Sequence, residues 1–492
     1  MSKKGLRIAI IAAEAAPFAK AGGLGDVIGS LPAALGDLGV ETKVFLPKYK
    51  LIKEAEWDLT RIIDKMVITL PRGTRIQVSV WRGFFPKSLS PIYFIDMPRY
   101  FVGEDIYSHS KMGRDFSIPF LAFTKAVFET MKALDWQPNI IHTHDWHVAI
   151  GNKWLHTIYK DDPFFAGTAS VLTIHNMAFQ GNIGWHMTKF LGLKRNDFFI
   201  ERQYAHFRGI NILATGIEAS DMVNTVSPTY AREILTPRYG AGLHRLLRTK
   251  RKRLIGILNG IDYTVFDPMH DETLVTRYSI KNIDKKVENK LELQRRLGLP
   301  VSPDIPIICI ISRLTSQKGI DLVDEAIPEL MKQGAQFVIL GSGSKRVERI
   351  FIKAEDKFPE QVAAHLEFDA ELAQFIYAGS DMLLMPSRFE PMGLSQIIAM
   401  RFGTIPIVRK TGGLADTVTD GKTGFVFRHY DANALVWAIR RALDAWYNHK
   451  DVWLTMQKRV MKKDFSWKSS AKKYVTLYRK AIRYHNAGHP EQ

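Results

Sequence analysis

The chain has 492 residues, of which 46% are hydrophobic and 24% charged, proportions typical of a globular protein and unlike those of a disordered or fibrous chain. Its single cysteine, Cys309, excludes a disulfide framework and a cysteine-rich metal or iron–sulfur site. Lysine and arginine outnumber aspartate and glutamate by 68 to 50, and the resulting formal charge of +18 raises the question of a polyanionic partner: nucleic acid, anionic lipid or a phosphorylated ligand.

Short apolar runs alternate with amphipathic stretches along the chain, which predicts parallel α/β layers. The run 7–12 predicts a buried first strand, and a Gly-rich turn at 22–25 leads into a helix that ends at Gly39. Further strands are predicted at 42–46, 91–95, 140–142, 169–174 and 222–226, with a helix over 120–134. A second series of strands is predicted at 307–311, 337–340, 382–385 and 405–408, each followed by a helical pattern.

The stretch between the two series is irregular, and a domain boundary is predicted at 255–262. An amphipathic tail over 466–484 predicts a terminal helix. The basic start, Met1 to Lys4, precedes an apolar run that Arg7 and Glu14 interrupt, so no leader is expected. No apolar run approaches the length of a membrane span, and with one cysteine we expect a cytoplasmic protein without membrane contact.

The Gly-rich turn resembles a later segment of the same chain. Lys20 to Asp26 and Lys410 to Asp416 share one skeleton, each between a strand and a helix. Paired glycines let a ligand approach the backbone, and a helix N-terminus attracts anions, so each loop is either a phosphate or sugar cradle or a plain turn. The dinucleotide fingerprint is not met, because Gly23-x-Gly25 is followed three residues on by Ile28.

Two loops after strands of the second series carry charged residues. Arg313 and Lys318 straddle a turn where a parallel sheet is expected to bind an anionic ligand, although a solvated loop is the alternative. Glu390 lies at a strand end just before a helix that Gly393 opens. Its carboxylate either holds sugar hydroxyls and stabilises a cationic transition state or simply satisfies the helix N-terminus.

Histidines gather in the segment His142 to His147, which also contains Asp145. A metal site is considered, but the order of ligands does not fit a binuclear metallohydrolase, and no metal is expected. His175 ends another strand and is either a site residue or a structural histidine. The basic run Arg245 to Arg253 lacks aromatic residues, so a solvated surface is favoured over nucleic-acid binding.

Taken together, these segments resemble the glycogen/starch synthase family of retaining glycosyltransferases over nearly the whole chain. The motifs that carry the resemblance are the Lys20 loop, Asp145 to His147, His175 to Gly181, Thr225 to Ala231, Ile257 to Asp262, Ser312 to Gly319 and Pro386 to Asp416. The resemblance implies an α/β protein of the GT-B fold, with two Rossmann-like domains facing across a cleft and a C-terminal helix crossing back to the first. The expected domains are 1–257 (acceptor side), 258–464 (nucleotide-sugar binding) and the helix 465–492.

The implied activity is transfer of glucose from ADP-glucose, or else UDP-glucose, to the non-reducing end of an α-1,4-glucan with retention of configuration and without metal or cofactor. The resemblance implies that Arg313 and Lys318 hold the donor diphosphate, with Lys20 assisting. Glu390 would contact the glucosyl unit and His175 the glucose. The remaining implied contacts are Asp145 and Asn259 on the sugar side of the site and the backbone at Gly23, Gly393 and Leu394.

The chain departs from the family at Met392, where many relatives have Cys, and at His244, where an acidic residue is common. Another GT-B enzyme with a different acceptor, or a catalytically silent glucan-binding relative, remains the alternative. Nucleic acid is not expected as a partner, and the sequence does not indicate an oligomeric state.

Overall fold

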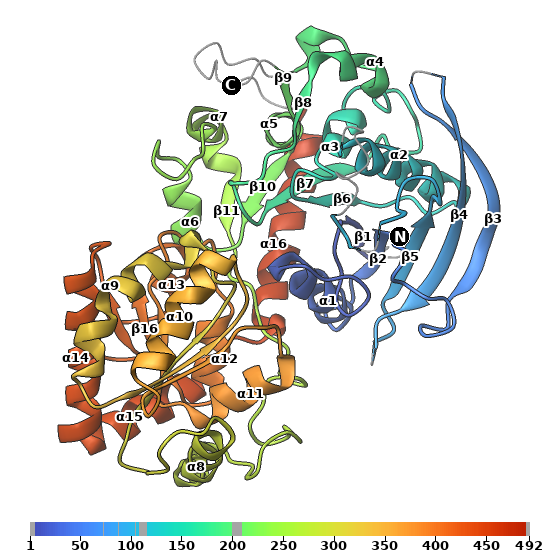
Figure 1. Cartoon of the computed structure of the whole chain (residues 1–492). Coiled ribbons are helices and arrows are strands. Elements are labelled where there is room, and N and C mark those ends of the chain that lie inside the picture. The colour runs from blue at the N-terminus through green and yellow to red at the C-terminus, as the bar shows by residue number, and fades with distance from the viewer. Residues whose placement is uncertain are drawn as a thin grey trace. The chain divides into compact units, whose positions relative to one another are not determined.

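The computed structural model describes residues 5–71, 73–86, 88–103, 105–107, 116–198 and 209–488, so Met1 to Lys4 lie outside the described residues. The chain divides into two compact units (Figure 1). Unit 1 comprises 1–226, 231–260 and 467–492, and unit 2 comprises 227–230 and 261–466. No helix in the described part of the chain has both the length and the apolar character needed to cross a membrane.

Unit 1 is built on a nine-stranded sheet in the order β11-β10-β7-β6-β1-β2-β5-β4-β3. Every pairing from β11 to β5 is parallel, while β4 pairs antiparallel with β5 and β3. The strands are β1 (Arg7–Ile11), β2 (Glu41–Pro47), β3 (Thr60–Thr69), β4 (Arg75–Phe84), β5 (Pro91–Asp96), β6 (Ile140–His144), β7 (Ala169–Ile174), β10 (Met222–Thr225) and β11 (Leu254–Gly256). A separate small ribbon pairs β8 (Asn182–Gly184) with β9 (Gly209–Asn211).

The helices of unit 1 cover both faces of this sheet. α1 (Gly23–Gly36) and the terminal helix α16 (Trp467–Asn486) contact each other on one face, where α16 also packs on β6, β7 and β10. The opposite face carries α2 (Ile118–Ala133) and α3 (Ile150–Leu155). The connection β1–β2, which contains α1, runs in one direction along the sheet, whereas the connections β5–β6 and β6–β7, which contain α2 and α3, run in the other, and right-handed crossovers then place the helices on opposite faces. The other helices are α4 (Thr188–Leu191), α5 (Ile212–Ala219) and α7 (His244–Thr249), and the residues of α6 (Pro228–Glu233) are divided between the two units.

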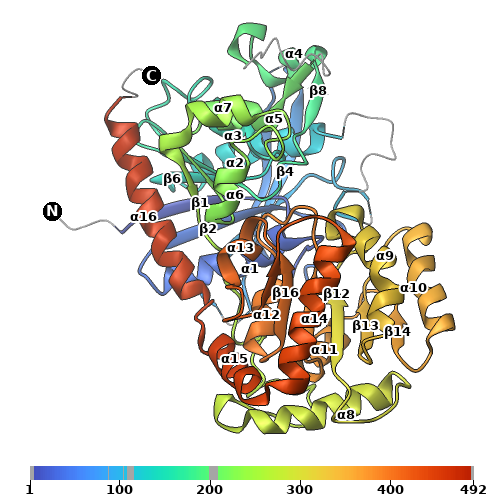
Figure 2. The same cartoon turned by 90° about the vertical axis from the view of Figure 1, so that its left-hand side faces the viewer.

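Unit 2 is a six-stranded parallel sheet in the order β14-β13-β12-β15-β16-β17 with helices between its strands (Figure 2). The strands are β12 (Ile307–Ile311), β13 (Gln336–Leu340), β14 (Val362–His365), β15 (Met382–Met385), β16 (Ile405–Arg409) and β17 (Phe425–Phe427). The helices are α8 (Lys286–Arg296), α9 (Ile320–Met331), α10 (Lys345–Lys357), α11 (Ala370–Gly379), α12 (Ser395–Arg401), α13 (Gly412–Thr417), α14 (Ala432–Asn448) and α15 (Lys450–Lys462).

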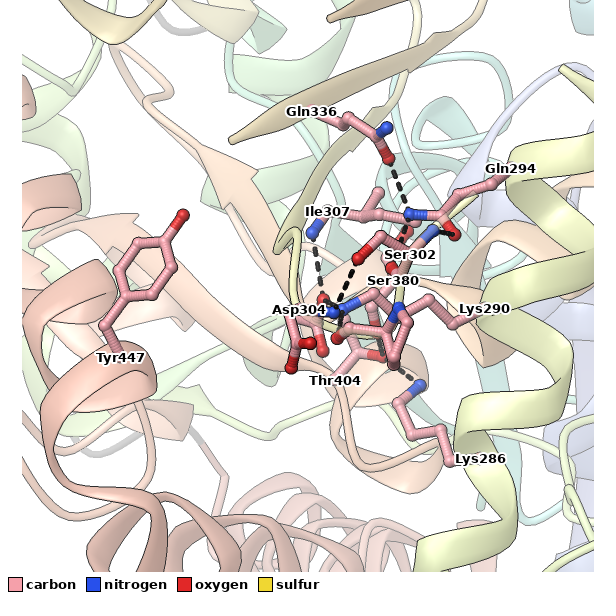
Figure 3. A network of polar contacts seen from close by, with 12 residues as sticks. Lys286, Lys290, Gln294, Ser302, Asp304, Ile307, Gln336, Ser380, Thr404 and Tyr447 are labelled. Carbon is pink, nitrogen blue, oxygen red and sulfur yellow. Dashed lines mark hydrogen bonds and ion pairs between the residues drawn. The ribbon is translucent and has the colours of Figure 1, made fainter. Parts of the chain in front are cut away.

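Buried polar contacts dock α8 at the amino-terminal edge of this sheet (Figure 3). The ammonium of Lys286 donates to the carbonyls of Tyr377 and Ala378 and to the hydroxyl of Thr404, at 2.6–3.1 Å. One turn later, Lys290 lies 2.8 Å from the Asp381 carboxylate. Two buried lysines therefore fix α8 against the amino-terminal edge of the sheet in unit 2. The candidate residues of this unit lie at the opposite, carboxyl-terminal edge.

The strands predicted from buried apolar runs are confirmed, several of them to the residue. The hairpin of β3 and β4 was not predicted. Only Ile68 is buried in β3, and β4 alternates polar with buried apolar residues over 75–80, because one side of the hairpin is exposed.

Candidate functional site

The candidate residues lie in loops that follow the carboxyl ends of parallel strands. In unit 1 these loops follow β1, β6, β7 and β11, and in unit 2 they follow β12, β15 and β16. This edge of an open α/β sheet is where ligands bind, because loops and helix N-termini converge there. Each unit by itself therefore presents a candidate binding edge.

The Gly-rich loop of unit 1 is shaped by Glu14, a residue that the sequence did not single out. Its buried carboxylate accepts the N–H groups of Ala21 and Gly22, each at 2.8 Å, and the hydroxyl of Tyr107 at 2.5 Å. A lone carboxylate at the end of an apolar run was the available signal. The loop therefore has a fixed backbone at the start of α1.

Lys20 is an exposed side chain of that loop and forms an ion pair with Asp26 at 2.6 Å. Burial nevertheless raises the pKa of Asp26 above its usual value, and the neighbouring Lys20 only partly offsets this effect. A Cβ placed on Gly23 would meet nothing within 4 Å, whereas one on Gly25 would lie 3.0 Å from Cγ of Lys20. The backbone at Gly23 is thus open to a ligand.

Asp145 and His175 form one backbone-linked pair at the ends of β6 and β7. Asp145 has a positive φ of 57°, and its carboxylate accepts the backbone N–H of His175 at 2.7 Å. Burial raises the pKa of Asp145 to about 7 and lowers the pKa of the His175 imidazole to about 3. His175 is therefore neutral at physiological pH and serves as a hydrogen-bonding group rather than a cation.

Asn259 follows β11 and is buried, and its side-chain oxygen has no hydrogen-bond partner among the described residues. An unpartnered buried amide oxygen is uncommon, since burying a polar atom without a hydrogen bond is unfavourable. Asn259 therefore keeps an acceptor available at this edge of unit 1.

In unit 2, the loops after β12 and β15 are joined by an ion pair. Lys318 donates to the Glu390 carboxylate at 2.6 Å, and the hydroxyl of Ser387 donates to the same oxygen at 3.0 Å. Glu390 is buried. Gly319 has a φ of 76°, and a Cβ there would lie 2.2 Å from the carbonyl oxygen of Pro386, so only glycine lets the two loops approach this closely.

Arg313 is exposed, and its guanidinium has no ion-pair partner within the part of the chain that the structure describes. It lies in the same loop as Lys318, nearer to the end of β12. Two cations, one free and one paired, therefore stand at this strand end and suit a diphosphate.

The second Gly-rich loop of the chain packs against the Glu390 loop. Gly412 has a φ of 44°, and a Cβ on it would lie 1.8 Å from the carbonyl oxygen of Glu390. Gly413 donates its N–H to the same carbonyl at 3.2 Å. Beside it, Gly393 has a φ of 73° and is followed by a partly exposed Leu394 and by α12, while Met392 is buried.

The basic run 245–253 is mostly exposed, as the favoured interpretation expects, since Arg245, Arg248, Arg251 and Lys252 lie at the surface, but two of its cations are used internally. Lys250 is 5% exposed and donates to the carbonyl of Glu218 at 2.5 Å. Arg253 lies over the ring of Tyr484 in α16, at 4.5 Å from the centroid. Part of the run is therefore structural and ties α7 and the following turn to the body of unit 1.

Two family models match the chain. Residues 7–249 match the starch synthase catalytic domain, and residues 296–455 match glycosyl transferases group 1. The first match covers the strands of the nine-stranded sheet except β11, and the second covers all six strands of the sheet in unit 2.

Relatives and a solved structure match along almost the full length. A glycogen synthase of Thermosipho melanesiensis is 43% identical over 97% of this chain and 99% of its own, and one of Thermotoga petrophila is 41% identical over the same shares. The catalytic domain of starch synthase IV from Arabidopsis thaliana, solved with ADP and acarbose, has a TM-score of 0.89 and 34% identity over 97% of this chain and 100% of that one.

Proposed function

Since the chain belongs to the glycogen synthase family of glycosyltransferases, we propose that it transfers glucose from ADP-glucose to the non-reducing end of an α-1,4-glucan with retention of configuration. The GT-B fold and a hexosyltransferase activity on glucan, with a nucleotide sugar as donor, come with that membership. The donor base, the stereochemistry and the residue roles are the proposed part.

The observation that carries the residue assignment is the buried pair of Lys318 and Glu390 beside the free Arg313. Breaking the anomeric bond leaves a diphosphate anion and a cationic sugar. Arg313 and Lys318 would stabilise the first and Glu390 the second, since preorganised charges in a water-poor site act strongly on developing charge. The backbone at Gly393 and Leu394 would meet phosphate or sugar oxygens.

Unit 1 would supply the remaining contacts. Lys20 and the open backbone at Gly23 suit the donor diphosphate, because the start of α1 carries a partial positive charge. The neutral His175 and the acceptors Asp145 and Asn259 suit sugar hydroxyls.

ADP is favoured as the leaving nucleotide because the Arabidopsis starch synthase domain was solved with ADP. We further propose a cytoplasmic location, which the single buried thiol of Cys309 fits.

The test measures transfer of radiolabelled glucose from ADP-glucose and from UDP-glucose, with and without glycogen primer. ADP-glucose with primer is expected to give the highest kcat/KM, and proton NMR of the product should show new α-1,4 linkages. Glu390→Ala should lower kcat by about a hundredfold or more, while Glu272→Ala, at an exposed carboxylate of the same unit, should not. Full activity of Glu390→Ala would refute the residue assignment, and faster turnover of UDP-glucose would refute the donor.

A further inference from the structure

Three histidines contact one another in sequence beneath the carboxyl ends of β6 and β7. His142 and His144 lie on the same face of β6, since side chains alternate along a strand, and their ring centroids are 4.1 Å apart. His144 Nδ1 lies 3.0 Å from His175 Nε2. On the other side, His142 Nδ1 lies 3.0 Å from the hydroxyl of Tyr478 in α16, the red helix of Figure 1.

The protons of His142 follow from its partners. The Thr173 hydroxyl donates to the side-chain oxygen of Asn224 at 2.5 Å, so it accepts from His142 Nε2–H at 2.6 Å. Burial lowers the pKa of His142 to about 3, so the ring is neutral and its Nδ1 accepts the hydroxyl of Tyr478. Both nitrogens of His142 are thus engaged, and its contact with His144 is made through the ring faces alone.

His144 and His175 share a single proton across their hydrogen bond. Burial lowers the pKa of His175 to about 3 and holds the pKa of His144 well below its usual value, so both rings are neutral. If His175 Nε2 donated, then His144 would carry its own proton on Nε2. That atom is buried and has no hydrogen-bond partner among the described residues. A buried N–H without an acceptor is rarer in proteins than an unused lone pair, so the opposite arrangement is favoured.

We propose that His144 is a positioning residue that donates its Nδ1–H to His175 Nε2 and thereby fixes His175 as the tautomer protonated on Nδ1. That nitrogen has no hydrogen-bond partner within the described residues, and the His175 side chain is partly exposed. The ring therefore offers an N–H donor, rather than a lone pair, to a sugar oxygen. Only this last step rests on the proposed function.

A fixed tautomer matters because a donor that is already aimed requires no reorganisation when the ligand binds. It also separates the two ends of the ring: Nε2 is committed to the protein and Nδ1 to the ligand. Tyr478, Thr173 and Asn224 hold His142 in place, and His142 supports the ring of His144, so α16 contributes to the alignment.

The first experiment reads the tautomer directly in the full chain labelled with ¹⁵N-histidine. Multiple-bond ¹H–¹⁵N spectra distinguish the two neutral tautomers, and the His175 signals are those lost in His175→Asn. We expect the proton on Nδ1 in the wild-type protein without substrate. A proton on Nε2 overturns the inference, and this measurement needs neither activity nor a variant of His144.

The second experiment compares two replacements of His144. His144→Asn keeps an amide N–H near the position of Nδ1, and should retain both the Nδ1–H tautomer and most of the activity. His144→Leu removes the donor, and should shift His175 toward the Nε2–H form and lower kcat/KM by about 10- to 100-fold. His156→Asn is the matched control, since that histidine contacts Ser170 at 3.1 Å and should leave the His175 signals unchanged.

If His144→Leu keeps the Nδ1–H tautomer or the wild-type kcat/KM, then His144 does not set the proton and the inference is wrong. If the wild-type chain carries out no glucosyl transfer at all, the proposed function fails while the tautomer remains readable.

Discussion

The ion pair of Lys318 and Glu390 can be tested by comparing the stability and the activity of variants that lack one or both charges. Its side chains are 17% and 7% exposed, and 2.6 Å separates Nζ from Oε2. Lys318→Met and Glu390→Gln each remove one charge, and the double variant removes both. We expect the double variant to be more stable than the sum of the two single effects predicts, and yet inactive.

The magnitude follows from burial. Removing one partner of a buried pair lowers the free energy of unfolding by about 3–5 kcal/mol, because the other charge stays buried, away from water and without a counter-charge. Ser387 still donates to Glu390 after Lys318→Met, which places that variant at the lower end, about 3 kcal/mol. Lys318 is the more exposed partner, so Glu390→Gln should cost less, about 2 kcal/mol. With both charges gone the cost should be about 2 kcal/mol, a coupling of about 3 kcal/mol.

Urea unfolding, followed by tryptophan fluorescence and by calorimetry, gives the four free energies, and glucosyl transfer is measured in parallel. The exposed pair of Arg277 and Glu272, 3.8 Å apart, is the control cycle and should show no measurable coupling. Strictly additive costs for Lys318 and Glu390 would refute the account of a desolvated pair. Recovery of activity in the double variant would refute the charge roles proposed for the two residues.

Two further predictions concern unit 2. Gly412→Ala should lower kcat more than tenfold with an unchanged circular dichroism spectrum, because its Cβ would lie 1.8 Å from the carbonyl oxygen of Glu390. Gly421→Ala is the control: Gly421 has a φ of 67° but open space around it, so the variant should lose about 1 kcal/mol of stability and no activity. Burial lowers the pKa of Lys286 from 10.5 to about 7. Between these two pH values the unfolded chain binds more protons than the folded chain, so the free energy of unfolding of the wild type should rise as pH increases from about 7 toward 10. Urea midpoints at several pH values should show this rise in the wild type and in Lys285→Met, whose side chain is exposed, but not in Lys286→Met, and an equal rise in all three would count against the assignment.

The predictable part of the fold is the part whose strands are buried on both faces. β7, β12 and β15 begin and end at the predicted residues because each is a continuous apolar run between polar turns. β3 and β4 escaped prediction since an exposed antiparallel hairpin leaves only a weak alternation in the sequence. Because β7, β12 and β15 were predicted correctly, the loops that follow them, which carry candidate residues, could also be located from the sequence.

What the sequence could not supply is pairing across strands. Nothing local indicates that Glu14 fixes the backbone of the loop at Ala21, or that His144 lies within hydrogen-bonding distance of His175. These contacts depend on the register of β6 against β7 and on the path of the chain after β1, which are set by packing over the whole sheet.

The two Gly-rich loops show how one motif serves two physical needs. At Gly23 a Cβ would meet nothing, so glycine there leaves space for a ligand. At Gly412 and Gly413 a Cβ would strike the backbone of Glu390 and Met392, so glycine there allows two protein loops to pack. The sequence left a ligand cradle and a plain turn open for each loop, and the structure gives the glycines of the second loop a role in packing two protein loops together.

The charge of +18 does not come from buried residues, although several cations have internal roles. Several cations of this chain are buried, and their donors are directed at backbone carbonyls or at a buried carboxylate: Lys250 at Glu218, Lys286 at Tyr377 and Ala378, Lys290 at Asp381 and Arg409 at Ser387. A cation used in this way satisfies acceptors that a sheet edge or helix end would otherwise leave unpaired. Among the described residues, however, as many carboxylates as cations are buried: Glu14, Asp221, Asp271, Asp381 and Glu390 against Lys125, Lys250, Lys286, Lys290 and Arg409. Their formal charges cancel, so burial does not lower the positive surplus that a polyanion would meet, and the few cations at the nucleotide site account for only a small part of it.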